Sequence, residues 1–370
     1  MKLGIEAFFL NTIHSGGKEQ VLFNLLKGFQ ALGKAGDIHV YAYDYSADML
    51  KSLIPDATFT FIPYNKIFLK KMIADLYNKT FKLSSLVKQQ GIDLLFFPYY
   101  NTGFKKFEIP TVVLPHDIQA ISNPGRFGLK TRIINGLQYY WDFKLRTRII
   151  AISDYDAREI EKYYPQHQSK IKRIYNPIDT DFSNPAADSP VTQPYICAVN
   201  VAYVHKNTLT LIKAYEKIMG KIEHNLLLIG HVNHETKFLK TYVKARHLED
   251  RIQFTGFLDD EELNQVLSRS ALFVNPSLFE GFGMTAIEAA IRHVPVLLSA
   301  AGASVEVTRS LLNYYEPADD YEVLAEKMLE ILQTKPSGSK LAAIRSEYLA
   351  CYDYMIISST YYEFFEGMME

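Results

Sequence analysis

Hydrophobic and polar positions follow one recurring pattern along the chain. Short runs rich in β-branched and aromatic residues are separated by longer amphipathic stretches, which is typical of βα units and parallel sheets. Before residue 185 the predicted strands are Leu3–Phe9, His39–Tyr43, Leu94–Phe97, Thr111–Leu114 and Ile149–Ile152. After residue 185 they are Tyr195–Val199, Asn225–Ile229, Ile252–Thr255, Leu272–Val274 and Val296–Leu298.

Two of the stretches between these runs have a clear helical period. From Lys18 to Leu32 the apolar residues of one face are Val21, Leu22, Leu25, Leu26 and Phe29, and from Thr208 to Met219 they are Leu211, Ile212, Tyr215 and Ile218. Amphipathic helices of this kind cover the faces of a sheet. The pattern therefore predicts an α/β fold with two Rossmann-like, doubly wound parallel-sheet domains.

A proline-rich segment divides the chain. Residues 184–194 contain Pro185, Pro190 and Pro194 among small polar residues, a composition that disfavours both helix and central strand. Residues 1–185 carry 24 Lys and Arg against 17 Asp and Glu, or +7, whereas residues 186–370 carry 16 against 24, or −8. Because the halves differ so clearly in charge, we place the domain boundary between residues 184 and 185.

Composition narrows the class of protein. The net charge of −1 argues against nucleic acid as a partner, because phosphate binding needs a basic surface. With 48% hydrophobic and 22% charged residues the chain is expected to be globular. Cys197 and Cys351 have no neighbouring cysteine, so we expect neither a disulfide framework nor a zinc site, as in a reducing cytoplasm. No signal peptide and no apolar run long enough to span a membrane are expected either.

The densest motif follows the predicted strand Leu272–Val274. Glu280, Gly281, Phe282, Gly283, Met284 and Thr285 occupy a turn that leads into a helix containing Glu288. Glycines let the backbone approach a ligand, and the N–H groups of a helix start suit a phosphate. The carboxylate of Glu288 can accept two hydrogen bonds from the vicinal hydroxyls of a ribose. This motif therefore predicts a nucleotide site at the turn.

Two other interpretations fit parts of the same motif. Thr285 and Glu288 have the spacing of a capping box, in which both side chains only satisfy backbone N–H groups. Gly281, Gly283 and Ala286 match a dinucleotide fingerprint, but that motif starts almost directly after its strand, whereas residues 275–280 intervene here.

Glu280 and Glu288 lie within the run from Pro276 to Ala289 with seven residues between them. This motif resembles that of family 4 retaining glycosyltransferases of the GT-B fold. Further segments resemble the family in the correct order over nearly the whole chain: Gly16-Gly17, His116-Asp117, 152–154, 175–179, 205–207, Gly256-Phe257, 294–296 and 304–307. The resemblance implies two domains that face a central cleft, at 1–184 and 185–354, with a helix at about 355–370 that packs back on the first. The first domain would serve the acceptor, and the second would hold the nucleotide sugar.

The resemblance also implies roles for single residues. His116, Lys206 and Glu280 are the expected catalytic residues; the expected donor-binding residues are Gly16, Gly17, Asn200, Gly281, Phe282, Gly283, Met284, Thr285 and Glu288. Lys206 would bind the diphosphate, although without the resemblance it would be interpreted as a solvated surface lysine. His116 would reach the donor sugar, although with Asp117 it also fits a loop pair that caps the next helix. Where the family often has Gly-Arg before this lysine, the chain has Asn200-Val201.

Retention of configuration requires either a double displacement or front-face transfer. A double displacement needs a carboxylate at the anomeric carbon, and no turn of the first half offers an obvious one. The resemblance instead implies front-face transfer, in which the leaving diphosphate takes the acceptor proton. The sequence has no Asp-x-Asp triplet after a strand and no His/carboxylate cluster, so we expect neither a metal nor a cofactor. A nucleotide-sugar epimerase and a silent sugar-binding subunit are the alternatives.

The expected substrates are less specific. Residues 116–119 with Pro124 and Phe127 resemble mannosyltransferases of surface-polysaccharide assembly, which favours GDP-mannose over a UDP-sugar and a glycan or lipid-linked glycan as acceptor. Residues 64–82 mix apolar residues with Lys66, Lys70, Lys71 and Lys79, as an interfacial helix does. We therefore consider a cytoplasmic protein in peripheral contact with an anionic membrane; an ordinary amphipathic helix with solvated lysines is the alternative.

Overall fold

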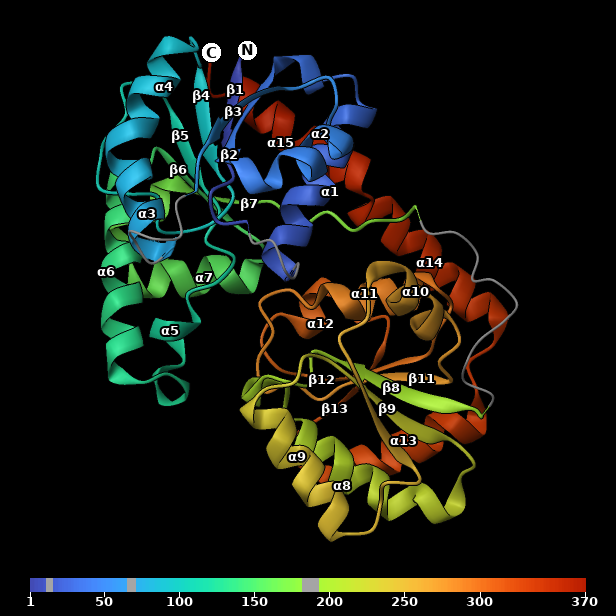
Figure 1. The fold of residues 1–370 in the computed structure, drawn as a ribbon. Helices are drawn as coiled ribbons and strands as arrows, with labels where there is room; N and C mark the ends of the chain where they lie inside the picture. The colour runs from blue at the N-terminus through green and yellow to red at the C-terminus, as the bar shows by residue number, and fades with distance from the viewer. Residues whose placement is uncertain (11–15, 65–70, 182–192) are drawn as a thin grey trace. The chain divides into compact units, whose positions relative to one another are not determined.

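The chain forms two compact α/β units. A computed structural model describes residues 1–10, 16–64, 71–181 and 193–370 (Figure 1). One unit comprises Met1–Ile178 with Tyr352–Glu370, and the other comprises Asp179–Cys351. Each contains one parallel sheet with helices on its faces, so the predicted fold class is confirmed. Residues 184–192 of the predicted linker lie outside the described residues.

The first unit has a seven-stranded sheet in the order β3-β2-β1-β4-β5-β6-β7. Its strands are β1 Leu3–Glu6, β2 Ile38–Tyr43, β3 Thr58–Ile62, β4 Leu94–Phe97, β5 Thr111–Val113, β6 Arg148–Ala151 and β7 Ile171–Arg173. Strands β3 and β7 were not predicted from the sequence. Both are edge strands with partly exposed side chains, so neither carries the fully apolar run that identifies a buried strand.

The last helix of the chain belongs to this first unit. The helices are α1 Gly17–Ala31, α2 Ala47–Leu53, α3 Lys71–Tyr77, α4 Leu83–Gln89, α5 Gln119–Ser122, α6 Leu129–Leu145, α7 Asp154–Tyr163 and α15 Tyr354–Glu366, with a π-helical turn at Asn78–Lys82. Helix α15 packs on α1 so closely that a Cβ on Gly28 would lie 2.1 Å from Ser358 Oγ. Glycine at this position therefore permits the contact.

The second unit has a six-stranded sheet in the order β10-β9-β8-β11-β12-β13. Its elements are β8 Tyr195–Val199, α8 Thr208–Ile218, β9 Asn225–Ile229, α9 His234–Ala245, β10 Ile252–Gly256, α10 Asp260–Ser268, β11 Leu272–Asn275, α11 Met284–Ile291, β12 Val296–Ser299, α12 Ser304–Val307, β13 Asn313–Tyr315, α13 Tyr321–Thr334 and α14 Gly338–Tyr352. The strand order reverses at β8, whose neighbours are β9 and β11. Ligands of open parallel sheets bind beyond the carboxyl ends of strands at such a point, so the turns after β8 and β11 mark the expected site.

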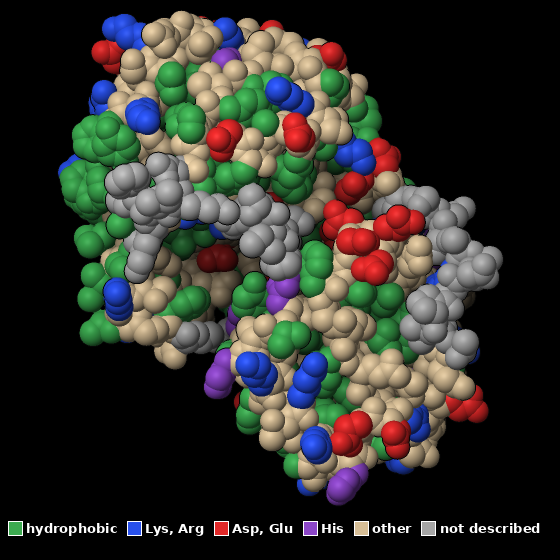
Figure 2. Space-filling view, viewed as in Figure 1, with side chains coloured by type: hydrophobic (Ala, Val, Ile, Leu, Met, Phe, Trp, Pro, Cys, Tyr) green, Lys and Arg blue, Asp and Glu red, His purple; other side chains and the backbone are tan. Residues whose placement is uncertain are grey.

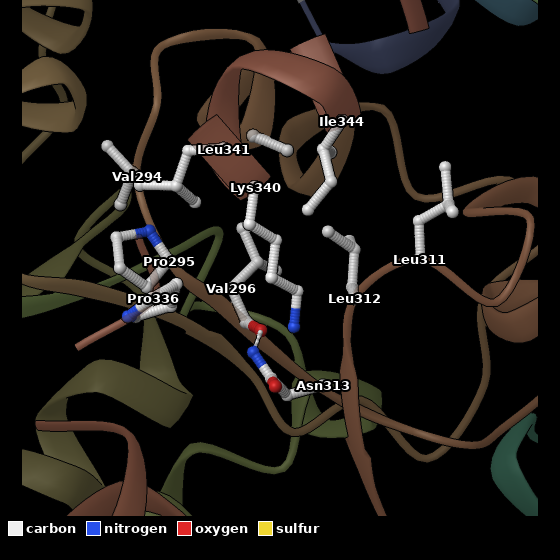
Figure 3. A pocket seen from close by; sticks show the side chains of 11 residues that line it. Val294, Pro295, Val296, Leu311, Leu312, Asn313, Pro336, Lys340, Leu341 and Ile344 are labelled. Atoms are coloured by element: carbon white, nitrogen blue, oxygen red, sulfur yellow. Dashed lines mark hydrogen bonds between the residues drawn. The ribbon is translucent and has the colours of Figure 1, made fainter. Parts of the chain in front are cut away.

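A small pocket of the second unit lies at the opposite edge of the sheet. Its lining includes Val296 and Asn313, the first residues of β12 and β13, and Leu341 and Ile344 of α14 (Figure 3). Asn313 donates a hydrogen bond to the Val296 carbonyl at 2.9 Å, the dashed line in the figure. Because it lies at the amino ends of these strands, this pocket is not the site that the motifs predict.

None of the helices in the described ranges has both the length and the apolar character needed to cross a lipid bilayer.

Candidate functional site

The turns after β8 and β11 bring Lys206 and Glu280 into contact. Lys206 Nζ lies 2.6 Å from Glu280 Oε1. Lys206 closes a 3₁₀ turn at Val204–Lys206, and the backbones of the two turns are joined, because Leu278 N donates to the His205 carbonyl at 2.8 Å. The spacing of the ion pair is therefore held by main chain as well as by side chains.

Three donors bind one oxygen of the Glu280 carboxylate, Oε1. Its Oε1 also accepts hydrogen bonds from Ser277 Oγ at 2.6 Å and Asn275 Nδ2 at 2.9 Å. Burial would raise its pKa, but the charge of Lys206 and the three hydrogen bonds together lower the pKa below its usual value. Among the residues that the structure describes, none donates to Oε2. That oxygen remains able to accept hydrogen bonds from the hydroxyls of a ligand.

Gly302, which the sequence analysis missed, supports Glu280 from the turn after β12. It has φ +64°, and a Cβ there would lie 2.4 Å from the Glu280 carbonyl oxygen. The next residue, Ala303, donates its N–H to the same carbonyl at 2.8 Å. A run of small residues directly after a predicted strand was the signal that could have identified this position.

The glycine-rich turn ends at the start of α11. Gly283 is the N-cap with φ +87°, and the helix begins at Met284. Thr285 therefore lies inside the helix, and the capping-box interpretation of Thr285 and Glu288 is wrong. Gly281 and Phe282 are buried just before this start. Ala286 N donates to the Gly283 carbonyl at 3.1 Å. The N–H groups at the very start of a helix have no acceptor within it, which suits them to bind an anion.

Glu288 lies further along α11, where acidic neighbours surround it. Burial raises its pKa; Arg292 opposes this shift, and Asp179 and Asp260 add to it. Arg292 donates to the Glu288 carbonyl and to Asn264 Oδ1, both at 2.7 Å. These hydrogen bonds fix Arg292 beside the candidate ribose partner.

Asn200, in the turn after β8, is exposed and has φ +62°. Asparagine is one of the few residues that adopts this left-handed conformation at low cost, so it replaces the glycine that the family often has here. The following Val201 is only 1% exposed and packs in the core. The Val201 side chain therefore provides no polar contact in place of the arginine that the resemblance implies here.

Two aromatic rings stack at the ends of β9 and β10. The rings of His231 and Phe257 lie 4.9 Å apart at an interplanar angle of 8°. Phe257 is partly exposed. Phe257 belongs to the segments that resemble the family, whereas His231 was not predicted. The signal for His231 is its position directly after the predicted strand Asn225–Ile229. A stacked pair of this kind offers a flat surface to another planar ring.

In the first unit, His116 follows β5 in a left-handed conformation with φ +68°. Its Nε2 lies 2.9 Å from the Pro98 carbonyl, which can only accept, so Nε2 carries the hydrogen and Nδ1 is an acceptor. Burial lowers the pKa of His116 to about 4, so the ring is neutral at pH 7. Asp117 Oδ1 accepts a hydrogen bond at 3.0 Å from the N–H of Gln119, the first residue of α5, whose N-cap is Ile118.

Gly16 and Gly17 form the start of α1, also in the first unit. Gly16 is the N-cap, and its N–H donates to Glu19 Oε2 at 3.0 Å. Among the residues that the structure describes, no atom lies within 4 Å of a Cβ added to Gly17. Lys18, which the sequence analysis missed, lies with its Nζ 4.0 Å from the ring centre of Tyr99, and burial lowers its pKa. His14 and Ser15 lie outside the described residues.

No group of three or more His, Cys, Asp or Glu side chains within the described ranges is arranged to hold a metal ion.

Two family models together match most of the chain. The model described as Glycosyltransferase Family 4 matches residues 15–182, and Glycosyl transferases group 1 matches residues 179–347. O-antigen chain mannosyltransferase B of Escherichia coli is 26% identical over 196 residues, 50% of this chain and 51% of the relative. O-antigen chain mannosyltransferase RfbU of Salmonella typhimurium is 25% identical over 293 residues, 77% of each protein. The chain thus spans about half of the first relative and about three quarters of the second.

Solved structures share the fold at low sequence identity. Sucrose-phosphate synthase of Thermosynechococcus elongatus superposes with a TM-score of 0.76 at 18% identity, covering 99% of this chain and 98% of that one. HepE of Anabaena, in complex with UDP and glucose, has a TM-score of 0.73 at 17% identity, with 99% of both chains covered. These matches support the two-sheet architecture.

Proposed function

We propose that this chain, which belongs to the family 4 glycosyltransferases of the GT-B fold, transfers a hexose from a nucleotide-diphosphate sugar to a glycan or lipid-linked glycan with retention of configuration. One observation carries the proposal. Glu280 is ionised, with Oε1 bound to Lys206, Ser277 and Asn275 and with Oε2 available to a ligand. A carboxylate held in this way can orient sugar hydroxyls beside a cation that stabilises a leaving diphosphate.

The proposed transfer is a front-face reaction without a metal or cofactor. The acceptor oxygen bonds to the anomeric carbon as the bond to the diphosphate oxygen breaks, and the diphosphate takes the acceptor's proton. Lys206 and the backbone N–H groups of residues 281–284 stabilise the charge that develops on the diphosphate. Lys206 Nζ has three donors, so it can bind the diphosphate while it still contacts Glu280.

The nucleoside is assigned to the second domain expected from the sequence, residues 185–354. Glu288 would bind the ribose hydroxyls, and the stacked rings of His231 and Phe257 provide a flat surface for the base. Asn200 lies after β8, where its exposed amide can replace the missing arginine in a contact to the diphosphate. These roles rest on the position of each residue at the carboxyl edge of the sheet.

The first domain, 1–184 with the helix at 355–370, is assigned to the acceptor. By the resemblance, His116 contacts the donor sugar, and Gly16 and Gly17 allow a ligand to approach the start of α1. Because His116 is neutral at pH 7, it would act through the Nδ1 acceptor rather than as a cation or an acid.

GDP-mannose is the proposed donor, with a UDP-sugar as the second candidate. The motif at residues 116–127 and the two O-antigen mannosyltransferases support mannose, whereas the UDP complex of HepE is the reason to test uridine nucleotides. A lipid-linked acceptor would place the reaction in the cytoplasm, at the inner face of the membrane.

A thermal-shift screen with GDP, UDP and ADP and their sugars tests the donor, because only a ligand of the native state raises the melting temperature. The preferred nucleotide should also be released slowly from its sugar without acceptor, and EDTA should leave that rate unchanged. Binding without release would instead indicate a silent subunit, an epimerised sugar would indicate an epimerase, and activity lost to EDTA and restored by Mg²⁺ would contradict the metal-free mechanism.

Glu288→Ala should weaken nucleotide binding by roughly 1.5–3 kcal/mol, the usual value of a hydrogen bond to a charged group. Calorimetric titration measures this. If nucleotide binding were unchanged and the melting temperature were lower, Glu288 would only stabilise α11 and would not bind the ribose.

A further inference from the structure

The positive charge of the first unit is concentrated in one stretch. Residues 71–148 carry 12 Lys and Arg against 5 Asp and Glu, so they hold the whole excess of +7 found in residues 1–185. This stretch includes α3, the π-helical turn, α4, α5 and α6. Its acids on α3 and α6, Asp75 and Asp142, are buried, whereas Lys82, Lys105, Lys130 and Lys144 are exposed.

The exposed apolar side chains are concentrated in the same stretch. In the described part of the first unit, eight of twelve exposed large hydrophobic side chains lie there: Ile73, Tyr77, Phe81, Phe104, Leu129, Ile133, Leu137 and Tyr140. We name these eight the apolar band. Three of them recur at intervals of four residues on α3 and the following turn, and four recur at intervals of four or three on α6. One face of each helical segment is thus apolar and uncovered within this unit.

Phe104 joins the two helical stripes into one surface. Its N–H donates to Thr80 Oγ1 at 3.3 Å in the π-helical turn, and its ring lies 6.0 Å from Trp141 of α6. Figure 1 shows α3 and α6 along the same side of the first unit, and Figure 2 shows hydrophobic side chains gathered along that margin. An uncovered apolar surface of this extent marks an interaction site.

Buried polar anchors hold this surface in place. Asp142, on the inner face of α6, accepts hydrogen bonds from the N–H groups of Asn101 and Thr102 at 2.6 and 2.9 Å. Arg146, 1% exposed, donates to the Lys105 carbonyl at 2.8 Å. Asp142 and Arg146 therefore fix the loop that presents Phe104, Lys105 and Lys106.

We propose that the apolar band, with its exposed lysines, is the surface on which the protein docks to an anionic lipid membrane. Apolar side chains that enter the interface, flanked by lysines that face acidic headgroups, are the chemistry of peripheral membrane binding. A second copy of the chain fits less well, because it would bring the same positive charge against itself. Docking would bring the enzyme to a lipid-linked acceptor. Only this purpose of the membrane contact rests on the proposed function.

The structure relocates the expected lipid contact. Lys66 and Lys70 lie outside the described residues, and Lys79 is buried against Glu6 at 3.1 Å, so the expectation that Lys79 faces lipid is wrong. Lys71 contacts Asp75 at 3.0 Å. The lysines available to a membrane are instead those around Phe104 and α6.

Co-sedimentation with vesicles tests the proposal. The wild-type protein should bind vesicles that contain phosphatidylglycerol, bind phosphatidylcholine vesicles far less, and be released by salt. Changing Lys82, Lys105 and Lys130 to glutamine should weaken binding to the anionic vesicles about a hundredfold, or about fivefold for each lysine. Changing Phe81, Phe104 and Leu137 to serine should weaken it at least about tenfold.

Matched variants in the second unit serve as controls. Phe238→Ser removes a ring that is 48% exposed, close to the 50% of Phe104, and glutamine at Lys237, Lys240 and Lys244 removes the same charge. Both controls should bind like the wild type. The proposal would be overturned if the band variants and the control variants lost vesicle binding equally. It would also be overturned if the wild-type protein did not bind anionic vesicles at low salt. A wild-type dimer in analytical ultracentrifugation that the serine variant abolishes would assign the band to self-association.

The release of nucleotide from donor sugar, measured without vesicles, separates this inference from the proposed function. The band variants should retain the wild-type rate. If no protein releases nucleotide, the proposed function fails, while the vesicle measurement still decides the role of the band.

Discussion

Two Lys–Glu pairs, one in each unit, show how the same residue types serve different ends. Glu6 ends β1 and pairs with Lys79 of the π-helical turn at 3.1 Å; Glu280 follows β11 and pairs with Lys206 at 2.6 Å. The side chains of the first pair are 1% (Lys79) and 0% (Glu6) exposed, and those of the second are 18% (Lys206) and 10% (Glu280) exposed. The first pair is closed to ligands, and the second is open on one side.

The electrostatics of the two carboxylates also differ in direction. Burial raises the pKa of Glu6, and the nearby charge of Lys79 does not fully offset it. Glu280 is also buried, but Lys206, Ser277 and Asn275 lower its pKa. A buried ion pair stabilises a fold only weakly yet is costly to break, whereas a carboxylate kept ionised beside an opening is suited to bind ligand. Exposure and the number of hydrogen-bond donors therefore separate a structural pair from a candidate site.

The largest expected effect is on stability. Lys79→Met should lower the free energy of unfolding by about 3–5 kcal/mol, because it leaves Glu6 buried without its charge partner. Urea unfolding measures this change, and Lys82→Met, three residues on and exposed, is the control. The nucleotide-release rate per folded molecule should stay at the wild-type level. If Lys79→Met were only mildly destabilised but no longer released nucleotide, the Glu6–Lys79 pair would belong to the functional site.

The second pair should give the opposite result. Lys206→Ala should lower the turnover number by about 10²–10³, the usual effect of removing one group that stabilises transition-state charge. The melting temperature should fall less than in Lys79→Met, because Ser277 and Asn275 still donate to Glu280 Oε1. Steady-state kinetics and thermal unfolding of the same sample measure both quantities, and a large loss of stability with normal turnover would contradict the distinction.

A glycine pair tests whether the position of Glu280 matters as well as its charge. Gly302→Ala should lower turnover by about a hundredfold, because the added Cβ collides with the backbone of Glu280 and displaces its carboxylate. Gly33 has a similar φ of +68°, and no atom of the described residues lies within 4 Å of the added Cβ. Gly33→Ala should therefore cost only about 1 kcal/mol of stability from backbone strain. Similar rates in the two variants would mean that the Gly302 contact has no part in activity.

The smallest expected effect is a difference in pH dependence. Because the pKa of Glu6 is raised in the folded state, its contribution to stability is complete below pH 4.5 and is lost as pH rises through the raised pKa. The pKa of Glu280 is lowered, so its contribution is present above pH 4.5 and is lost as pH falls through the lowered pKa. The stability difference between wild type and Glu6→Gln should therefore fall with rising pH, and that for Glu280→Gln should rise. Thermal unfolding at several pH values measures both differences. If both changed with pH in the same direction, the comparison of the two carboxylates would be refuted.

The sequence was most informative where burial is complete. The central strands were predicted closely, since both of their faces are apolar, but β13 was missed, as β3 and β7 were, because this edge strand carries Asn313 and two tyrosines. The motif identified Lys206 and Glu280, but not their contact, which depends on how two turns pack. Lys79 was misplaced because a π-helical turn changes the direction in which side chains point relative to a regular α-helix. That change brings a lysine from an apparently exposed face into contact with Glu6.

The packing of α15 on α1 has a consequence for synthesis of the protein. Residues 179–351 leave the ribosome complete before residues 354–366, which the first unit needs to cover Phe29 and Phe96. During that interval α1 presents Gly28 and its apolar neighbours without Ser358 and Tyr362 against them. The unit that is translated first is therefore finished last, and a truncation before α15 would damage the amino-terminal unit while leaving the later one intact.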